Sequence, residues 1–441
     1  MRKLILSLAA TPLILGSIAV SAQAADEVAV APDAGFNIFS DVEFKAQLRP
    51  RYEYTDHKAI TTQDAGHTLT NRTNLNVTGT LFEVDGLVGT VEVNSVNDFN
   101  TLDQTTHQRA GELDVAKMTQ ANVSYTAAGV TGIVGRKTVN LDNQRFIGSV
   151  GWKQNFQTLD LVAAAYGAGD FNVIAAYVYG VNAIGDDGFG TAGDQYVGTV
   201  TSGATNSIAV NASYKILDPI KLTGYAYLLG SYSDTLGLAA TGKIAMGDSA
   251  KLNYRAEFAV QSNATLEQVE GISGDTSLRG DAMYYNLDVG ANISGFLVGA
   301  NYEVLGGADV NDASTSQFST PLATKHKFNG WADQFLVTPT TGLADLNVRG
   351  GYKFATAGKI IAVYHMFTAD ADSATAATGG VAAGDTYGSE FDVAYSTKVP
   401  GVNNLGLLVK AAMYMDDDSN GVTADDTTLA WVQLDYKFST K

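Results

Sequence analysis

Residues 42–54 read VEFKAQLRPRYEY, and this stretch decides the fold. Apolar and aromatic side chains alternate with charged or amide side chains along its length, with Pro50 as a local exception because proline cannot donate to a strand ladder. A strict period of two predicts a β-strand with one apolar and one polar face. Strands in soluble proteins average about five or six residues. The much longer pattern therefore indicates a tilted transmembrane strand with its apolar face toward lipid and its polar face toward a wet lumen.

The same alternation recurs at 251–261 and 430–438, with weaker versions between them. Eight very short connections, each carrying Gly, Asp or Pro, alternate with nine longer, mostly polar stretches. The short ones lie at 84–86, 127–129, 168–170, 217–219, 247–249, 293–295, 356–358 and 399–401, and the long ones at 55–68, 97–112, 139–156, 181–206, 232–237, 263–280, 306–342, 369–386 and 415–426. These connections predict about eighteen strands, with sixteen as the alternative count. The fold class is all-β: a transmembrane antiparallel β-barrel with short periplasmic turns and long extracellular loops.

The N-terminus has the pattern of a secretory signal. Arg2 and Lys3 precede an apolar stretch over 4–20, and Ala22-Gln23-Ala24 supplies a cleavage site. After residue 24 no apolar run reaches the length of a spanning helix, so a membrane protein of this sequence must be a closed barrel. We expect a signal peptide over 1–24, a periplasmic lead-in over 25–40 and a barrel over 41–441. Sec-type export would deliver the barrel as an integral protein of the bacterial outer membrane.

Charge and composition narrow the classes of function. The formal net charge of −18 argues against a nucleic-acid partner. The chain has no cysteine, which suits an oxidising compartment without proving one. The five histidines are too scattered for a ligand cluster, and no catalytic order of Ser, His and acid stands out, so we expect no enzyme and no cofactor.

Polar positions of the predicted strands are expected to line the pore and to set its selectivity. On the strands these candidates are Lys45, Arg49, Arg51, Arg72, Glu92, Arg255, Glu257 and Arg349. The alternative is that these charges pair with one another and only keep the interior wet. The loop over 139–156, which carries Arg145 and Lys153, is predicted to form the constriction. Its alternative is an outward loop that packs on its neighbours.

A family resemblance lies at the same place. Residues 135–160 read GRKTVNLDNQRFIGSVGWKQNFQTLD. This stretch resembles the signature of the alginate-export-like outer-membrane family and is similar to the wider group of eighteen-strand porins. The matching positions are Gly135, Arg136, Asn140, Gln144, Arg145, Gly148, Trp152, Gln154 and Asp160. The resemblance implies an eighteen-strand barrel. The best-known member passes an anionic polysaccharide through a basic lumen, which would give Arg136 and Arg145 the selectivity role here.

Two departures favour a general porin over an alginate channel: the chain is acidic overall, and acids mix with the basic residues of the predicted lumen. The predicted function is passive diffusion of small hydrophilic solutes and ions. The alternatives are a selective channel or exporter for an anionic saccharide, and a surface adhesin or receptor. Expected partners are outer-membrane lipid and lipopolysaccharide together with these solutes, and the assembly would be a monomer or a homotrimer.

One stretch is a weak candidate for a metal site. Asp416, Asp418, Asn420 and Gly421 match the opening of a calcium loop, but the twelfth position is Thr427, where a bidentate glutamate is needed. We therefore expect a solvated acidic rim with no dedicated metal site.

Overall fold

The computed structural model describes residues 37–58, 63–99, 107, 108, 112, 114–184, 203–230, 232–247, 249–262, 282–310, 316–376, 380–417 and 425–441. The predicted signal peptide and most of the predicted lead-in lie outside the described residues. Within them, no helix is long and apolar enough to cross a membrane.

Eighteen antiparallel strands of the described residues form one sheet that closes on itself. They are β1 (Phe39–His57), β2 (Gly66–Leu81), β3 (Leu87–Asp98), β4 (Val115–Ala127), β5 (Val130–Lys137), β6 (Thr158–Ala168), β7 (Phe171–Asn182), β8 (Gly203–Leu217), β9 (Ile220–Leu229), β10 (Ser233–Met246), β11 (Ala250–Ser262), β12 (Ala282–Ile293), β13 (Phe296–Leu305), β14 (Leu343–Lys353), β15 (Lys359–Thr368), β16 (Thr386–Lys398), β17 (Leu405–Asp416) and β18 (Thr427–Ser439). A single turn of 3-10 helix, η1 (Lys325–Lys327), lies between β13 and β14.

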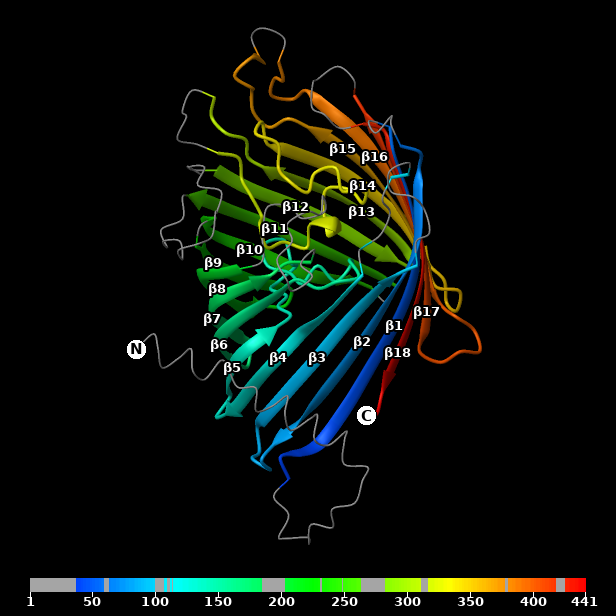
Figure 1. Cartoon of the computed structure of the whole chain (residues 1–441). Coiled ribbons are helices and arrows are strands. Elements are labelled where there is room, and N and C mark those ends of the chain that lie inside the picture. Colours follow the sequence, from blue (N-terminus) through cyan, green and yellow to red (C-terminus); the bar gives the residue numbers. More distant parts are fainter. Residues whose placement is uncertain are drawn as a thin grey trace.

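Closure of the barrel is made by the first and last strands. Each strand pairs with its successor, and β1 also pairs with β18, from Lys45 opposite Ser439 to His57 opposite Thr427. Among the described strands no edge is left open, which a membrane-spanning sheet requires because lipid satisfies no backbone groups. The predicted fold class is confirmed, with eighteen strands rather than the alternative sixteen (Figure 1).

The outer face of the barrel is apolar, as the alternation predicted. On β1, Leu48 and Tyr52 are 44% and 42% exposed, whereas Arg49 and Arg51 are 5% and 0% exposed. A soluble protein would bury the first pair and expose the second. The pattern of exposure is reversed because the outer face of the barrel meets lipid and its inner face meets a polar interior.

Short and long connections alternate as predicted except between β9 and β10. The eight connections predicted to be short have two to six residues, and the β9–β10 connection, predicted to be long, has only three. Two of them, Ala128-Gly129 and Ser294-Gly295, have positive φ at both positions, the conformation that best matches strand twist in a two-residue hairpin. One predicted long loop, 232–237, is wrong, because β10 already begins at Ser233. Its polar residues suggested a loop, but Ser233 and Thr235 are 0% and 2% exposed on the inner side of a strand.

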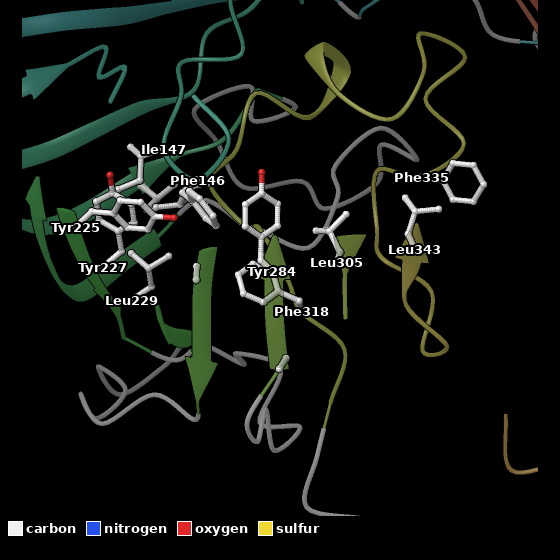
Figure 2. Packing of buried hydrophobic residues seen from close by; sticks show 14 of the residues in the cluster. Phe146, Ile147, Tyr225, Tyr227, Leu229, Tyr284, Leu305, Phe318, Phe335 and Leu343 are labelled. Atoms are coloured by element: carbon white, nitrogen blue, oxygen red, sulfur yellow. The ribbon is translucent and has the colours of Figure 1, made fainter. Parts of the chain in front are cut away.

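The buried apolar core lies inside the ring of strands. In Figure 1 the segment that contains η1 lies within the barrel, apart from the wall. Figure 2 shows Phe146 and Ile147, from the connection between β5 and β6, packed beside Tyr225, Tyr227 and Tyr284 of the wall. The core is thus built between inward-folded loops and the wall, which places those loops in the path of any solute.

Candidate functional site

The connection between β5 and β6, here called the first inner loop (residues 138–157), is held on one side by β1. Arg49 donates to the carbonyl of Gly151 at 3.0 Å and to Gln154 Oε1 at 2.8 Å. Arg51 donates to the carbonyl of Trp152 at 2.6 Å. Because both arginines lie on the inner face of β1, this part of the loop lies inside the barrel. The donors of both arginines are used by loop carbonyls and by the side-chain oxygens of Gln154 and Gln433.

The same loop is fixed on the far side of the barrel. Phe146 packs against Tyr225 of β9 and Tyr284 of β12, with ring centroids 5.1 Å and 5.3 Å apart (Figure 2). In the closed ring β9 lies eight strands from β1, close to diametrically opposite. The first inner loop therefore crosses the lumen, and the alternative of an outward loop is wrong. Its role as the narrowest point of the pore stays a prediction.

Arg145 makes a buried ion pair at this far side. Its Nε and Nη2 donate to the two carboxylate oxygens of Glu303 at 2.9 Å and 3.2 Å, and Nη2 also donates to Asn329 at 2.9 Å. Burial alone would lower the pKa of Arg145, but the ion pair with Glu303 outweighs it and raises that pKa. The guanidinium is 2% exposed, so it is a structural anchor whose charge is neutralised inside the protein.

A second inner loop (306–310 and 316–342 of the β13–β14 connection) also folds inward, and sequence reasoning missed this. Its Ala332 N–H donates to Glu390 of β16 at 2.7 Å, and the Trp331 N–H donates to the same oxygen. Phe335 packs on Phe367 of β15, with ring centroids 4.6 Å apart. Aromatic residues in a long, otherwise polar loop were the signal available in the sequence, because a fully solvated loop has no use for them.

The two inner loops are hydrogen-bonded to each other. The Gly148 N–H donates to the carbonyl of Leu322 at 2.9 Å, and the Thr324 N–H donates to the carbonyl of Gln144 at 3.0 Å. A Cβ on Gly148 would come within 2.1 Å of Thr324 Oγ1, so only glycine permits this approach. The loops therefore behave as one body inside the barrel.

Lys410 of β17 fixes this body to the wall beside β1. Its Nζ lies 4.1, 3.9 and 5.2 Å from the ring centroids of Trp152, Trp331 and Trp431, which are all three tryptophans of the chain. The Nζ also donates to Nε2 of His326 at 2.7 Å. A desolvated cation over aromatic faces gains about 2 kcal/mol. One tryptophan comes from each inner loop and one from β18. The group of Lys410, His326 and the three tryptophans, here called the Lys410 box, therefore joins both inner loops to the wall.

His326 is the titratable centre of that box. Its ring stacks on Trp152 at 4.6 Å, and its Nδ1 lies 2.7 Å from Asp333 Oδ1. Burial lowers the pKa of His326 to about 3. Burial would raise the pKa of Asp333, but the facing His326 and Lys153 outweigh it and hold that pKa below its usual range. His326 is therefore neutral at ordinary pH, with one nitrogen accepting from Lys410.

The predicted lumen charges on the strands are inward but mostly paired. Arg349 forms two hydrogen bonds to Asp288, at 2.7 Å and 2.9 Å. The remaining candidates have these partners: Lys45 with Glu43, Arg72 with Gln47, Glu92 with Asn76, Thr119 and Gln120, Lys153 with Asp333, and Arg255 with both Glu257 and Asp142. Lys45, Lys153, Arg255 and Arg349 thus pair with carboxylates, whereas Arg72 and Glu92 hydrogen-bond to neutral side chains. A selectivity role for any of them stays a prediction.

Arg136 is not where the prediction put it. β5 continues to Lys137, and its register places Arg136 opposite Asp160, on the face that carries Val134 and Val162. Those two valines are 54% and 44% exposed on the outside of the barrel. Arg136 therefore faces outward and is paired with Asp160 at 2.8 Å. Its predicted selectivity role came from the family resemblance and is wrong, because the alternation along β5 puts Arg136 on the same outer face as Val134.

A set of lysines lies at the periplasmic end, and the sequence prediction did not single it out as a group. Lys243 alternates with Ile244 and Met246, which are 38% and 45% exposed on the outer face, so its own side chain is on the inner face. The same alternation holds for the whole set, here called the lysine belt: Lys221, Lys243, Lys251, Lys353, Lys359 and Lys398. All six are exposed, and among the described residues none forms an ion pair. Their position within a few residues of four of the short turns was the available signal.

The metal candidates gain no support. Asp418 and Asn420 lie outside the described residues, and the Asp416 N–H donates to Asp426 at 3.0 Å. Across the described part of the chain, no three His, Asp or Glu side chains are grouped so as to hold a metal ion.

Residues 40–291, more than half of the chain, match the alginate export family. No curated protein matches the chain.

Several solved outer-membrane proteins share the fold. The crystal structure of Pseudomonas aeruginosa OpdK with vanillate matches with a TM-score of 0.67 and 12% identity, covering 91% of this chain and 100% of that one. Acinetobacter baumannii OccAB3 gives a TM-score of 0.67 at 15% identity, over 90% and 99% of the two chains. Pseudomonas aeruginosa OccK8 (OprE) gives 0.65 at 15%, over 92% and 100%. At these identities the matches establish the architecture alone.

Proposed function

The chain belongs to the alginate export family, and we propose that it forms a water-filled channel through which small hydrophilic solutes and ions diffuse passively. It is an integral protein of the bacterial outer membrane. The proposal rests on one observation above all: a closed eighteen-strand ring whose inner face carries many polar side chains. We propose a channel rather than an enzyme.

The lysine belt supports a preference for anions. Six exposed cations without ion pairs to described residues surround part of the periplasmic mouth, while the charges that hold the inner loops are paired. A low-dielectric wall concentrates the field of such charges and raises the local concentration of counter-ions. The channel should therefore favour anionic solutes over cationic ones of the same size.

A selective path for an anionic saccharide is the second candidate, favoured by the same belt and by the family. Against it, the first inner loop presents Arg145 already neutralised by Glu303, so the crossing loop offers no free basic track. We therefore place the general channel first.

Planar-bilayer recording of the refolded protein tests the proposal. Discrete conductance steps in KCl are expected, and their absence would overturn it. In a KCl gradient the reversal potential should indicate anion preference. Replacing Lys353, Lys359 and Lys398 together by glutamine should move it toward cation preference. Lys58→Gln, at the other end of the barrel and paired with Asp56, is the matched control and should leave it unchanged.

A further inference from the structure

An apolar cavity lies inside the barrel between the first inner loop and the wall formed by β5 to β8. Its volume is about 200 Å³. The wall contributes mainly aliphatic side chains, among them Leu161, Ala176 and Val178, and the loop contributes Leu141 and Ile147. Inner faces of water-filled barrels are ordinarily polar. A polar lining for a water-filled lumen therefore does not explain an apolar recess at this position.

Part of this apolar wall has an obvious structural use. Leu161 and Val178 are each 2% exposed and belong to the core that packs against Ile147. Lower on the wall, Ile133, Ile174 and Ala176 remain half-buried and border the cavity. The loop thus covers the upper part of the apolar wall and leaves the lower part available to a guest.

The cavity has a polar rim with a single charge. Lys137, Thr138 and Asn140 line it where β5 passes into the loop, and no carboxylate lines it. Lys137 forms no ion pair with any described residue. An unpaired ammonium beside an apolar recess suits a guest with an apolar body and one negative charge, because each part then meets its complement.

We propose that this cavity is a binding subsite for a small amphipathic anion, whose apolar group enters the recess while its acidic group faces Lys137. An apolar cavity of roughly 150 Å³ is enough for a benzene ring. The recess therefore admits one phenyl or branched alkyl group and little more. A sugar ring would leave its hydroxyl groups without partners there, which costs free energy for each buried group. The subsite separates amphipathic anions from saccharides.

The inference rests on the proposed channel, and the test keeps the two apart. The probe is 3-phenylpropanoate, added to the periplasmic side of single channels in KCl, with gluconate as the hydrophilic anion and 3-phenylpropanol as the uncharged analogue. Conductance steps before any addition test the channel itself. Concentration-dependent block by 3-phenylpropanoate, much weaker for gluconate, tests the subsite.

Two adjacent residues of β7 provide a matched pair of variants. Ala176 is half-buried and lines the cavity, whereas Ala175 is exposed on the outer face. Ala176→Leu fills the recess and should weaken block by 3-phenylpropanoate about tenfold, the equivalent of losing one to two buried methylene groups. Ala175→Leu should leave block unchanged. Equal effects, or no effect, of the two variants would overturn the subsite while leaving the channel intact.

Lys137→Gln separates the charged part of the guest from its apolar part. It should weaken block by 3-phenylpropanoate a few-fold and leave block by 3-phenylpropanol unaltered. If both compounds respond equally, Lys137 does not contact the acidic group and the proposal fails in that respect. If gluconate blocks as well as 3-phenylpropanoate in the wild-type channel, the recess plays no part in selection.

Discussion

Replacing Arg145 by methionine should release the first inner loop from the far wall. The side chain joins the loop to Glu303 of β13 through two hydrogen bonds and to Asn329 of the second inner loop through another. Methionine keeps most of the volume and removes the charge. Glu303 would then remain 2% exposed with only Tyr284 and Asn329 as hydrogen-bond donors, at 2.8 Å and 2.7 Å.

The magnitude follows from this loss. Breaking a buried ion pair by removing one partner costs about 3–5 kcal/mol, because the other charge is left uncompensated. At the lower value the population of loops detached from β13 rises about 100-fold, since each 1.4 kcal/mol is tenfold. The double variant Arg145→Met/Glu303→Gln removes the stranded charge as well. Its destabilisation should be clearly smaller than that of the single variant.

Single-channel recording reports the detached state as brief increases in conductance, and heat-modified gel mobility reports global stability. Arg349→Met is the matched control, because its pair with Asp288 has side chains 23% and 25% exposed and touches neither inner loop. An ion pair exposed to this extent contributes at most about 1 kcal/mol. Recordings of this variant should therefore show no additional increases in conductance. If Arg145→Met channels are as quiet as the wild type, or if Arg349→Met channels are as noisy, the loop is not held by the pair.

Three further outcomes follow from the described contacts. Arg136→Gln should leave the reversal potential unchanged, because the side chain faces outward; a shift would return it to the lumen. Gly148→Ala should raise conductance, because the added Cβ would come within 2.1 Å of Thr324 Oγ1 and force the inner loops apart. Gly151→Ala is the control and should leave conductance unchanged, because no heavy atom lies nearer than 3.9 Å to its added Cβ. Equal conductance of the two variants would refute the contact. Because burial lowers the pKa of His326 to about 3, loop packing should be complete above about pH 6.5 and be lost as the pH falls toward 3. In His326→Gln the increase in channel noise at low pH should be smaller than in the wild type. If the variant and the wild type show the same pH profile of channel noise, His326 is not the group that titrates.

The barrel wall could be read from the sequence because its physics is local. Lipid on one side and a polar interior on the other impose a period of two on every strand, and the stretch at 42–54 displays it without needing any distant residue. The strand count came from the alternation of short and long connections. The count was right, but the predicted loop at 232–237 was wrong, because polar residues on the buried inner face of a strand were taken for a loop.

The interior could not be read in the same way, because its contacts are not local. Arg145 and Glu303 are 158 residues apart, and the sequence around either residue does not indicate the other as its partner. The box around Lys410 draws on both inner loops and on two strands, so no single stretch contains its pattern. The prediction for Arg136 was wrong for a different reason: its role was taken from the family resemblance, whereas the alternation of its own strand places it on the outer face with Val134.

The mixed charge of the predicted lumen was the main obstacle to naming a solute, and the contacts divide that mixture into two groups. Near the inner loops, Arg49, Arg51 and Arg145 are buried and use their donors on loop carbonyls or Glu303, so they hold the first inner loop in place. Near the short turns, the lysine belt is exposed and has no ion pair among the described residues. A passing ion responds to charge that is both uncompensated and close to its path. Selectivity by charge should therefore reside in the lysine belt, whereas the buried arginines should determine conductance and its stability.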